Sequence, residues 1–266
     1  YGVVDGVFVS NFVGSDAFAA VNLIMPVVMI LGSVGFMIGT GGSAIVSKTL
    51  GEGKKEKARE YFSMLIYLCI VSGVALSAIG IIFIRPIAAA LGARGSIADD
   101  CVIYGRTLLV MLTALFLQNA FQSFLVVAEK PKLGLGVSLL AGFTNMFLDF
   151  LFIYVLKLGV FGAALATGIG QCIPAIAGLV FFMFSKGELR FTGFKLSLRE
   201  LGHACYNGSS EMVSELSNSV VTVLFNLVLM RLAGEAGVAA ISILLYGQFL
   251  FNAFYLGFTI GISPIV

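Results

Sequence analysis

A long apolar run that contains a single charge is the strongest constraint on what this chain can fold into. Residues 133–156 read LGLGVSLLAGFTNMFLDFLFIYVL, and Asp149 is the only charged residue among them. A helix of about 20 residues crosses a hydrocarbon core of ~30 Å, so the run is long enough to span a membrane. A carboxylate at such depth is costly, and the default interpretation of an intramembrane acid is functional. The alternative is a buried acid that only joins helices through hydrogen bonds.

Small and polar residues follow one face of this predicted helix. Ser138, Gly142, Asn145 and Asp149 are spaced by four, three and four residues. Residues three and four apart are neighbours on a helix, so these four residues form a single stripe. Asn145 lies one turn from Asp149 and can form a hydrogen bond with it.

The composition extends the membrane prediction to the whole chain. Hydrophobic residues make up 59% of the 266 residues and charged residues 11%, whereas soluble domains carry about 25% charged residues. We therefore predict an all-α polytopic membrane protein. The chain opens and stops inside apolar runs, so we expect a fragment with further helices on both sides.

Apolar runs separated by polar connections predict about eight transmembrane helices, the first of them truncated. The seven further runs lie near residues 17–47, 61–84, 107–128, 133–156, 162–185, 205–230 and 238–266. Most basic residues lie in the connections that follow the second, fourth and sixth helices, which places those connections in the cytoplasm by the positive-inside rule. We expect residues 1–186 to form a first lobe, 187–204 a cytoplasmic linker and 205–266 the start of a second lobe.

A weak internal repeat supports this division into two lobes. With a shift of 220 positions, GSDAFAAVN at 14–22 aligns with GEAGVAAIS at 234–242, and the register holds without a gap to residues 46 and 266. The offset spans six helices, so both copies enter the membrane in the same direction. Parallel repeats of this kind are a transporter architecture, with the substrate between the halves.

Further polar residues at helical spacing extend the set of candidate site residues. They are Gln118 and Gln122 in the fourth helix, Thr167 and Gln171 in the sixth, and Gln248, Asn252 and Tyr255 in the eighth. Such stripes either hold helices together, at about 0.6 kcal/mol per hydrogen bond, or line a water-filled cavity between the lobes. The number of stripes favours the cavity. Glu211 and Glu215 lie one turn apart and are either a second ionisable site or solvated acids at a helix N-terminus.

Six stretches of the chain resemble the multidrug and toxic compound extrusion (MATE) family. They are Asp5 with FVSNFVG at 8–14, SKTLGEGKKEKARE at 47–60, NMFLDFLFI at 145–153, GVFGAALATGIGQ at 159–171, NGSSEMVSELS at 207–217 and GISPIV at 261–266. The resemblance runs through the whole chain. It implies a twelve-helix bundle of two six-helix lobes in the bacterial cell membrane, which exports organic cations and drugs in exchange for H⁺ or Na⁺.

The same resemblance implies a proton or Na⁺ site in the first lobe, with no cofactor other than this coupling ion. Its members would be Asp5, Asn145, Asp149 and Thr167. Two departures from the family stand out: Phe150 follows Asp149 where many members have Pro, and Gly208-Ser209-Ser210 stands where many have Gly-x-Pro. The candidates for an ion site in the second lobe are Glu211, Glu215 and Asn218.

We predict an antiporter that alternates access between two rocking lobes. Its partners would be cationic or amphipathic drugs and membrane lipid, with no nucleic acid, and we expect a monomer. Burial penalises the charge of a carboxylate, so two nearby acids favour uptake of a proton or a shared Na⁺. That neutralisation would let the first and fifth helices repack and expel the drug.

Three other functions remain as alternatives to an antiporter. The nearest is a lipid-linked precursor flippase of the same superfamily, although such proteins tend to have a cationic cavity and the mid-membrane charges here are acidic. An intramembrane enzyme is more remote, because four cysteines without CxxC spacing and a single histidine, His203, indicate no metal or catalytic cluster. A channel would more naturally show rings of pore-lining residues.

Overall fold

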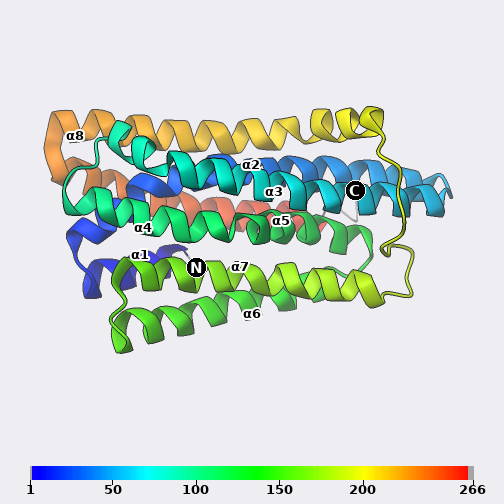
Figure 1. The fold of residues 1–266 in the computed structure, drawn as a ribbon, viewed down its shortest axis with the longest axis horizontal. Helices are drawn as coiled ribbons and strands as arrows, with labels where there is room; N and C mark the ends of the chain where they lie inside the picture. Colours follow the sequence, from blue (N-terminus) through cyan, green and yellow to red (C-terminus); the bar gives the residue numbers. More distant parts are fainter. Residues whose placement is uncertain (1, 263–266) are drawn as a thin grey trace. The chain divides into compact units, whose positions relative to one another are not determined.

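The structure is a computed structural model that describes residues 2–262, with side chains described for residues 4–225 and for part of 226–258. Within this range the chain forms helices and no strand (Figure 1). In chain order the helices are α1 (Gly2–Phe12), α2 (Ser15–Gly51), α3 (Lys55–Ala90), α4 (Ser96–Val110), α5 (Leu112–Val127), α6 (Pro131–Asp149), the π-helix η1 (Phe150–Val155), α7 (Gly159–Phe184) and α8 (Leu198–Ile262).

Several of these helices are long and apolar enough to cross a membrane. Among the described residues they are Ser15–Gly51, Lys55–Ala90, Pro131–Val155 and Gly159–Phe184. The bent pair α4 and α5 makes a fifth candidate if it is counted as one span. The predicted class of an all-α polytopic membrane protein is therefore confirmed.

The fourth predicted helix differs from the expectation of one uninterrupted span. It begins earlier, at Ser96, and is divided at Met111 into α4 and α5, which are bent by 51°. No Pro or Gly lies beside Met111. The break faces α7, where a Cβ added at Gly168 would lie 2.7 Å from Cγ of Met111. The bend therefore accompanies close tertiary packing and has no local sequence signal.

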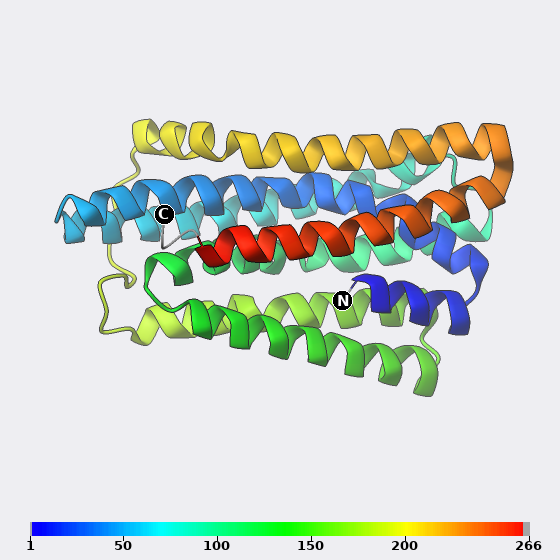
Figure 2. The same cartoon turned by 180° about the vertical axis from the view of Figure 1, so that it is seen from behind.

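The chain divides into two compact units, Tyr1–Ser219 and Val220–Val266. α8 is helical across their junction, and its ribbon turns sharply within the orange part of the chain (Figures 1 and 2). The two helices expected at residues 205–230 and 238–266 therefore stay a prediction. The connection that precedes α8 is non-helical over residues 185–197. Side chains at 233–240 and all of residues 263–266 lie outside the described residues. The second copy of the repeat, which includes Ser263, Ile265 and Val266, and the GISPIV motif therefore stay predictions.

Close approach of backbones organises the first unit. α2 packs against α3, α4 and α5, while α7 packs against α5 and α6, and both views show α6 beside α7 (Figures 1 and 2). A Cβ at Gly35 would lie 2.8 Å from Cα of Phe116, and one at Gly39 would lie 2.9 Å from Cα of Ala120. Both pairs are spaced by four residues, the arrangement by which small residues let membrane helices pack backbone to backbone.

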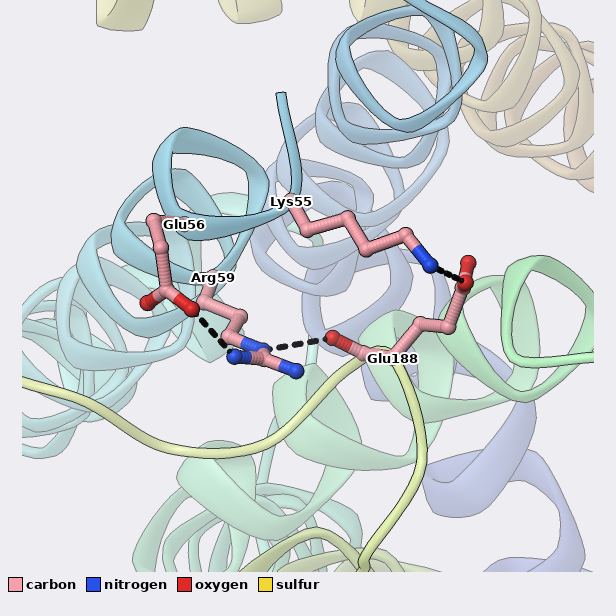
Figure 3. Close-up of polar contacts among 4 residues, drawn as sticks. All are labelled: Lys55, Glu56, Arg59 and Glu188. Atoms are coloured by element: carbon pink, nitrogen blue, oxygen red, sulfur yellow. Dashed lines mark hydrogen bonds and ion pairs between the residues drawn. The ribbon is translucent and has the colours of Figure 1, made fainter. Parts of the chain in front are cut away.

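The connection between α7 and α8 is fastened to the start of α3. Arg59 donates a 2.8 Å hydrogen bond to the backbone carbonyl of Glu188 and forms an ion pair with Glu56 (Figure 3). Lys55 forms an ion pair with the Glu188 carboxylate. Arg59 is largely covered by these neighbours, with 13% of its side chain exposed. The long polar connection is therefore held against the helix bundle at this point.

Candidate functional site

Three helices bring four polar side chains together in the interior of the first unit. Asp5 comes from α1, Asn145 and Asp149 from α6, and Thr167 from α7. Each of the four is at most 3% exposed. Thr167 Oγ1 donates a 2.6 Å hydrogen bond to Asp5 Oδ2. The side chains of Asn145 and Asp149 also interact with Asp5, although neither forms a hydrogen bond of regular geometry.

Several buried polar atoms of this cluster have no hydrogen-bond partner among the described residues. They are Asp5 Oδ1, Asn145 Oδ1 and Nδ2, and Asp149 Oδ1 and Oδ2. The hydrogen bond that helical spacing permits between Asn145 and Asp149 is not formed. An unpaired buried polar group costs about 1–3 kcal/mol, and a charged group costs more. The cluster is therefore suited to a species that neutralises it, either a proton on the carboxyl groups or a small cation among the oxygens.

The oxygen-rich composition of the cluster fits a hard cation as well as a proton. Asp5, Asn145, Asp149 and Thr167 offer carboxylate, carboxamide and hydroxyl oxygens, which hard cations prefer as ligands. Within the described chain, no group of three or more His, Cys, Asp or Glu side chains is arranged to hold a metal ion. A proton or Na⁺ site with two acids at these positions stays a prediction.

A glycine allows α6 and α7 to approach at the height of the cluster. A Cβ at Gly170 would lie 3.2 Å from Cβ of Asn145 and 3.5 Å from the carbonyl oxygen of Ala141. Thr167 lies three residues before Gly170, on the same face of α7. The absence of a side chain at Gly170 therefore lets Asn145 and Thr167 share the buried interior with Asp5.

The structure places some of the other candidates as helix contacts. Gln171 is buried one turn beyond Thr167 on α7. Gln118 is half-buried and Gln122 exposed on α5, and Gln122 donates a 3.1 Å hydrogen bond to Ser138 on α6. The stripe on α5 thus serves, at Gln122, to join two helices.

The candidates on α8 fall into two groups. Glu211 and Asn218 are exposed and Glu215 is half-buried, and the charges of Glu211 and Glu215 interact with each other. The second group, which is exposed and belongs to the second unit, comprises Gln248, Asn252 and Tyr255. All of these residues stay predictions as parts of an ion site or substrate path.

The helix type changes next to Asp149, a feature that the sequence patterns did not predict. α6 is α-helical up to Asp149 and continues as η1 from Phe150. The N–H of Leu156 donates a 2.9 Å hydrogen bond to the carbonyl of Leu151, five residues earlier, as in a π-helix. No Pro or Gly lies between residues 149 and 156, so the sequence has no local signal for this turn. Phe150, which stands where many members of the MATE family have Pro, is the first residue of η1.

Comparison with known proteins decides the family. The sequence model of the MatE family matches residues 1–151, more than half of the chain, and this range includes Asp5, Asn145 and Asp149. The chain belongs to the MatE family. As a member of a transporter family, the MatE chain is not an enzyme, and it is an integral protein of the bacterial cell membrane, as the sequence predicted.

Two similar proteins match nearly all or most of the MatE chain. Multidrug export protein MepA from Staphylococcus aureus (strain MRSA252) is 25% identical over 264 residues, which are 99% of this chain and 56% of the relative. MepA from Staphylococcus haemolyticus (strain JCSC1435) is 27% identical over 191 residues, which are 72% of this chain and 42% of the relative. The resemblance to the multidrug and toxic compound extrusion family is thereby confirmed.

A solved structure shares the fold. It is the inward-facing conformation of a multidrug resistance MATE family transporter of the MOP superfamily, with a TM-score of 0.84 and 26% identity over 100% of this chain and 59% of that chain. The MatE chain thus spans less than two thirds of the length of the relatives that it matches.

Proposed function

We propose that this MatE chain is part of a multidrug exporter that moves organic cations out of the cell in exchange for H⁺ or Na⁺. The observation that carries the proposal is the buried cluster of Asp5, Asn145, Asp149 and Thr167, in which five polar atoms have no hydrogen-bond partner among the described residues. The names of the MepA relatives support drugs as the class of cargo.

The cluster can couple ion occupancy to helix packing through the cost of buried charge. A bound proton or Na⁺ neutralises the two acids and lets α1, α6 and α7 pack around them. When the ion leaves, two like charges remain in a medium of low dielectric constant, where both desolvation and repulsion are unfavourable. The helices then favour another packing, and alternating access follows if the two packings open to opposite sides of the membrane.

The sign of the buried charge favours organic cations over anionic cargo. Asp5 and Asp149 are acids within membrane-spanning helices, and the described parts of these helices bring no Lys or Arg to the cluster. A flippase for a lipid-linked pyrophosphate needs cationic side chains to bind its cargo. The cluster therefore supports the exporter more than the flippase.

Transport under separate gradients tests the proposal. The full-length protein that contains this chain is placed in lipid vesicles, and ethidium export is followed under a pH gradient alone and a Na⁺ gradient alone. We expect Asp149→Asn to lower gradient-driven export about ten-fold or more, which corresponds to ~1.4 kcal/mol. Asp99→Asn, at a side chain that is 69% exposed, should leave export unchanged. Normal export and ion coupling in Asp149→Asn would refute the proposal.

A further inference from the structure

The π-helix η1 contacts both of the helices that carry the other site residues. On the α1 side, Phe12 packs edge-on against Tyr154, with ring centroids 5.1 Å apart. On the α7 side, Gly162 is so close that a Cβ there would lie 3.0 Å from Cβ of Phe152. The middle of η1, at Phe152, therefore packs against α7 and its far end, at Tyr154, against α1, while Asp149 lies at the near end of the π-helical turn.

Backbone hydrogen bonds separate the two ends of this segment. The N–H of Phe150 still points to the carbonyls of Met146 and Phe147, as in an α-helix. At the other end, the N–H of Leu158 donates a 2.9 Å hydrogen bond to the carbonyl of Phe152, six residues earlier. The transition from regular α-helix to wider turns thus occurs at Asp149 itself.

A π-helical turn is a compliant element in a helix. It holds one more residue than an α-helical turn, appears mostly as single turns within α-helices and is frequent at functional sites. Sharp kinks of helices also concentrate at such turns. Here neither oxygen of the Asp149 carboxylate has a hydrogen-bond partner of regular geometry among the described residues.

We propose that η1 is a hinge that positions Asp149 relative to Asp5. When the coupling ion binds or leaves, the segment of α6 that carries Asp149 moves about this turn, while Phe152 and Tyr154 of η1 stay in contact with Gly162 and Phe12. The inference rests on the proposed ion coupling and adds the part of the chain that moves. Tyr154 is a positioning residue in this account, since it does not contact the ion.

Deletion of one residue tests the hinge. Deleting Phe150, which is 46% exposed, removes the extra residue of the turn and lets α6 continue as an α-helix. Phe150→Leu is the matched control, because it loses the same aromatic ring but keeps the chain length. The readout is the infrared carbonyl band of protonated Asp149 in the full-length protein, assigned by its loss in Asp149→Asn and followed against pH and Na⁺. In the deletion variant, we expect the pH at which half of this band is lost to move by about one unit, or the Na⁺ concentration for half-loss to change about ten-fold. Phe150→Leu should match the parent.

Two results would overturn the hinge. One is a folded deletion variant, with the parent's unfolding temperature, that keeps the parent's band midpoint and ethidium export. If the deletion prevents folding, two variants of Tyr154 test the hinge instead. Tyr154→Phe keeps the ring against Phe12 and should match the parent, whereas Tyr154→Ala removes the ring and should move the midpoint of the band. A parental midpoint in Tyr154→Ala is the second such result. Ion coupling that survives Asp149→Asn contradicts the proposed function itself, whatever the Phe150 and Tyr154 variants do.

Discussion

Thr167 and Asp5, 162 positions apart in the sequence, are joined by a 2.6 Å hydrogen bond in which the threonine hydroxyl donates to the carboxylate. Both side chains are buried, at 1% and 3% exposure. The bond fastens α7 to α1 at the point where Asn145 and Asp149 of α6 also meet. A hydrogen bond to a charged group contributes about 1.5–3 kcal/mol, so this single contact can bias the ion affinity of the cluster.

Removal of the Thr167 hydroxyl should weaken ion coupling. Thr167→Ala leaves Asp5 without its hydrogen-bond donor, and we expect the H⁺ or Na⁺ concentration for half-maximal ethidium export to change about ten-fold, as a loss of ~1.4 kcal/mol predicts. Thr167→Ser keeps the hydroxyl and should stay near the parent. Thr107→Ala, which removes a hydroxyl that donates to the Ile103 carbonyl on α4, serves as the control. Identical ion dependence in Thr167→Ala and Thr167→Ser would argue against a role for the bond.

The approach of α6 and α7 at Gly170 should tolerate no branched side chain. Gly170→Val places a Cβ 3.2 Å from Cβ of Asn145, and overpacking of this kind costs about 1–3 kcal/mol. Gly136→Val is the matched control on α6, because a Cβ there meets no atom within 4 Å and the effect on helix propensity is the same. Thermal unfolding of the full-length protein measures the difference. Equal unfolding temperatures for the two variants would show that the contact does not restrain the helices.

An added methyl group where α2 and α8 cross should destabilise the protein, as a larger side chain at Gly170 should. A Cβ at Gly208 would overlap the carbonyl oxygen of Met37, and one at Gly41 would overlap the carbonyl oxygen of Ala204. Backbone atoms cannot rotate aside, so we expect Gly208→Ala to lower the free energy of unfolding by about 1–3 kcal/mol. Gly202→Ala on the same helix has open space and should be neutral or stabilising by up to about 1 kcal/mol. A Gly208→Ala protein as stable as Gly202→Ala would contradict this packing.

The connection before α8 should depend on Arg59 more than on the Glu188 carboxylate. The backbone carbonyl of Glu188 accepts the bond from Arg59 and survives Glu188→Ala, which removes only an exposed ion pair worth about 0–1 kcal/mol. Arg59→Ala removes the bond itself. Limited proteolysis of residues 185–197 should therefore be faster in Arg59→Ala than in Glu188→Ala. Equal rates of cleavage would show that the hydrogen bond does not hold the connection.

The membrane class and most helices follow from the sequence because apolar runs of sufficient length have few other solutions in lipid. Asn145 and Asp149 could also be grouped from the sequence alone, since both lie on one helical stripe. Asp5 and Thr167 could be added only through the family resemblance. No periodicity links residues 162 positions apart, and their contact depends on how three helices pack.

Two breaks in the helices were beyond sequence reasoning. The bend at Met111 and the π-helical turn after Asp149 both lack Pro and Gly, the usual signals of a distorted helix. At Met111 the bend faces Gly168, and at η1 the turn faces Gly162 and Phe12. In each case a neighbouring helix packs closely against the break, and sequence patterns within one helix carry no information on that contact.

Ion release on drug binding tests the central claim most directly. Ethidium is added to the full-length protein in lipid nanodiscs, and released H⁺ or Na⁺ is counted in weakly buffered solution. If the drug and the coupling ion compete through the Asp5 and Asp149 cluster, linkage requires that each lowers the affinity of the other. We therefore predict ion release in the parent and in Asp99→Asn, and none in the variant with both Asp5→Asn and Asp149→Asn. Undiminished ion release from a double variant that still binds ethidium would contradict the account.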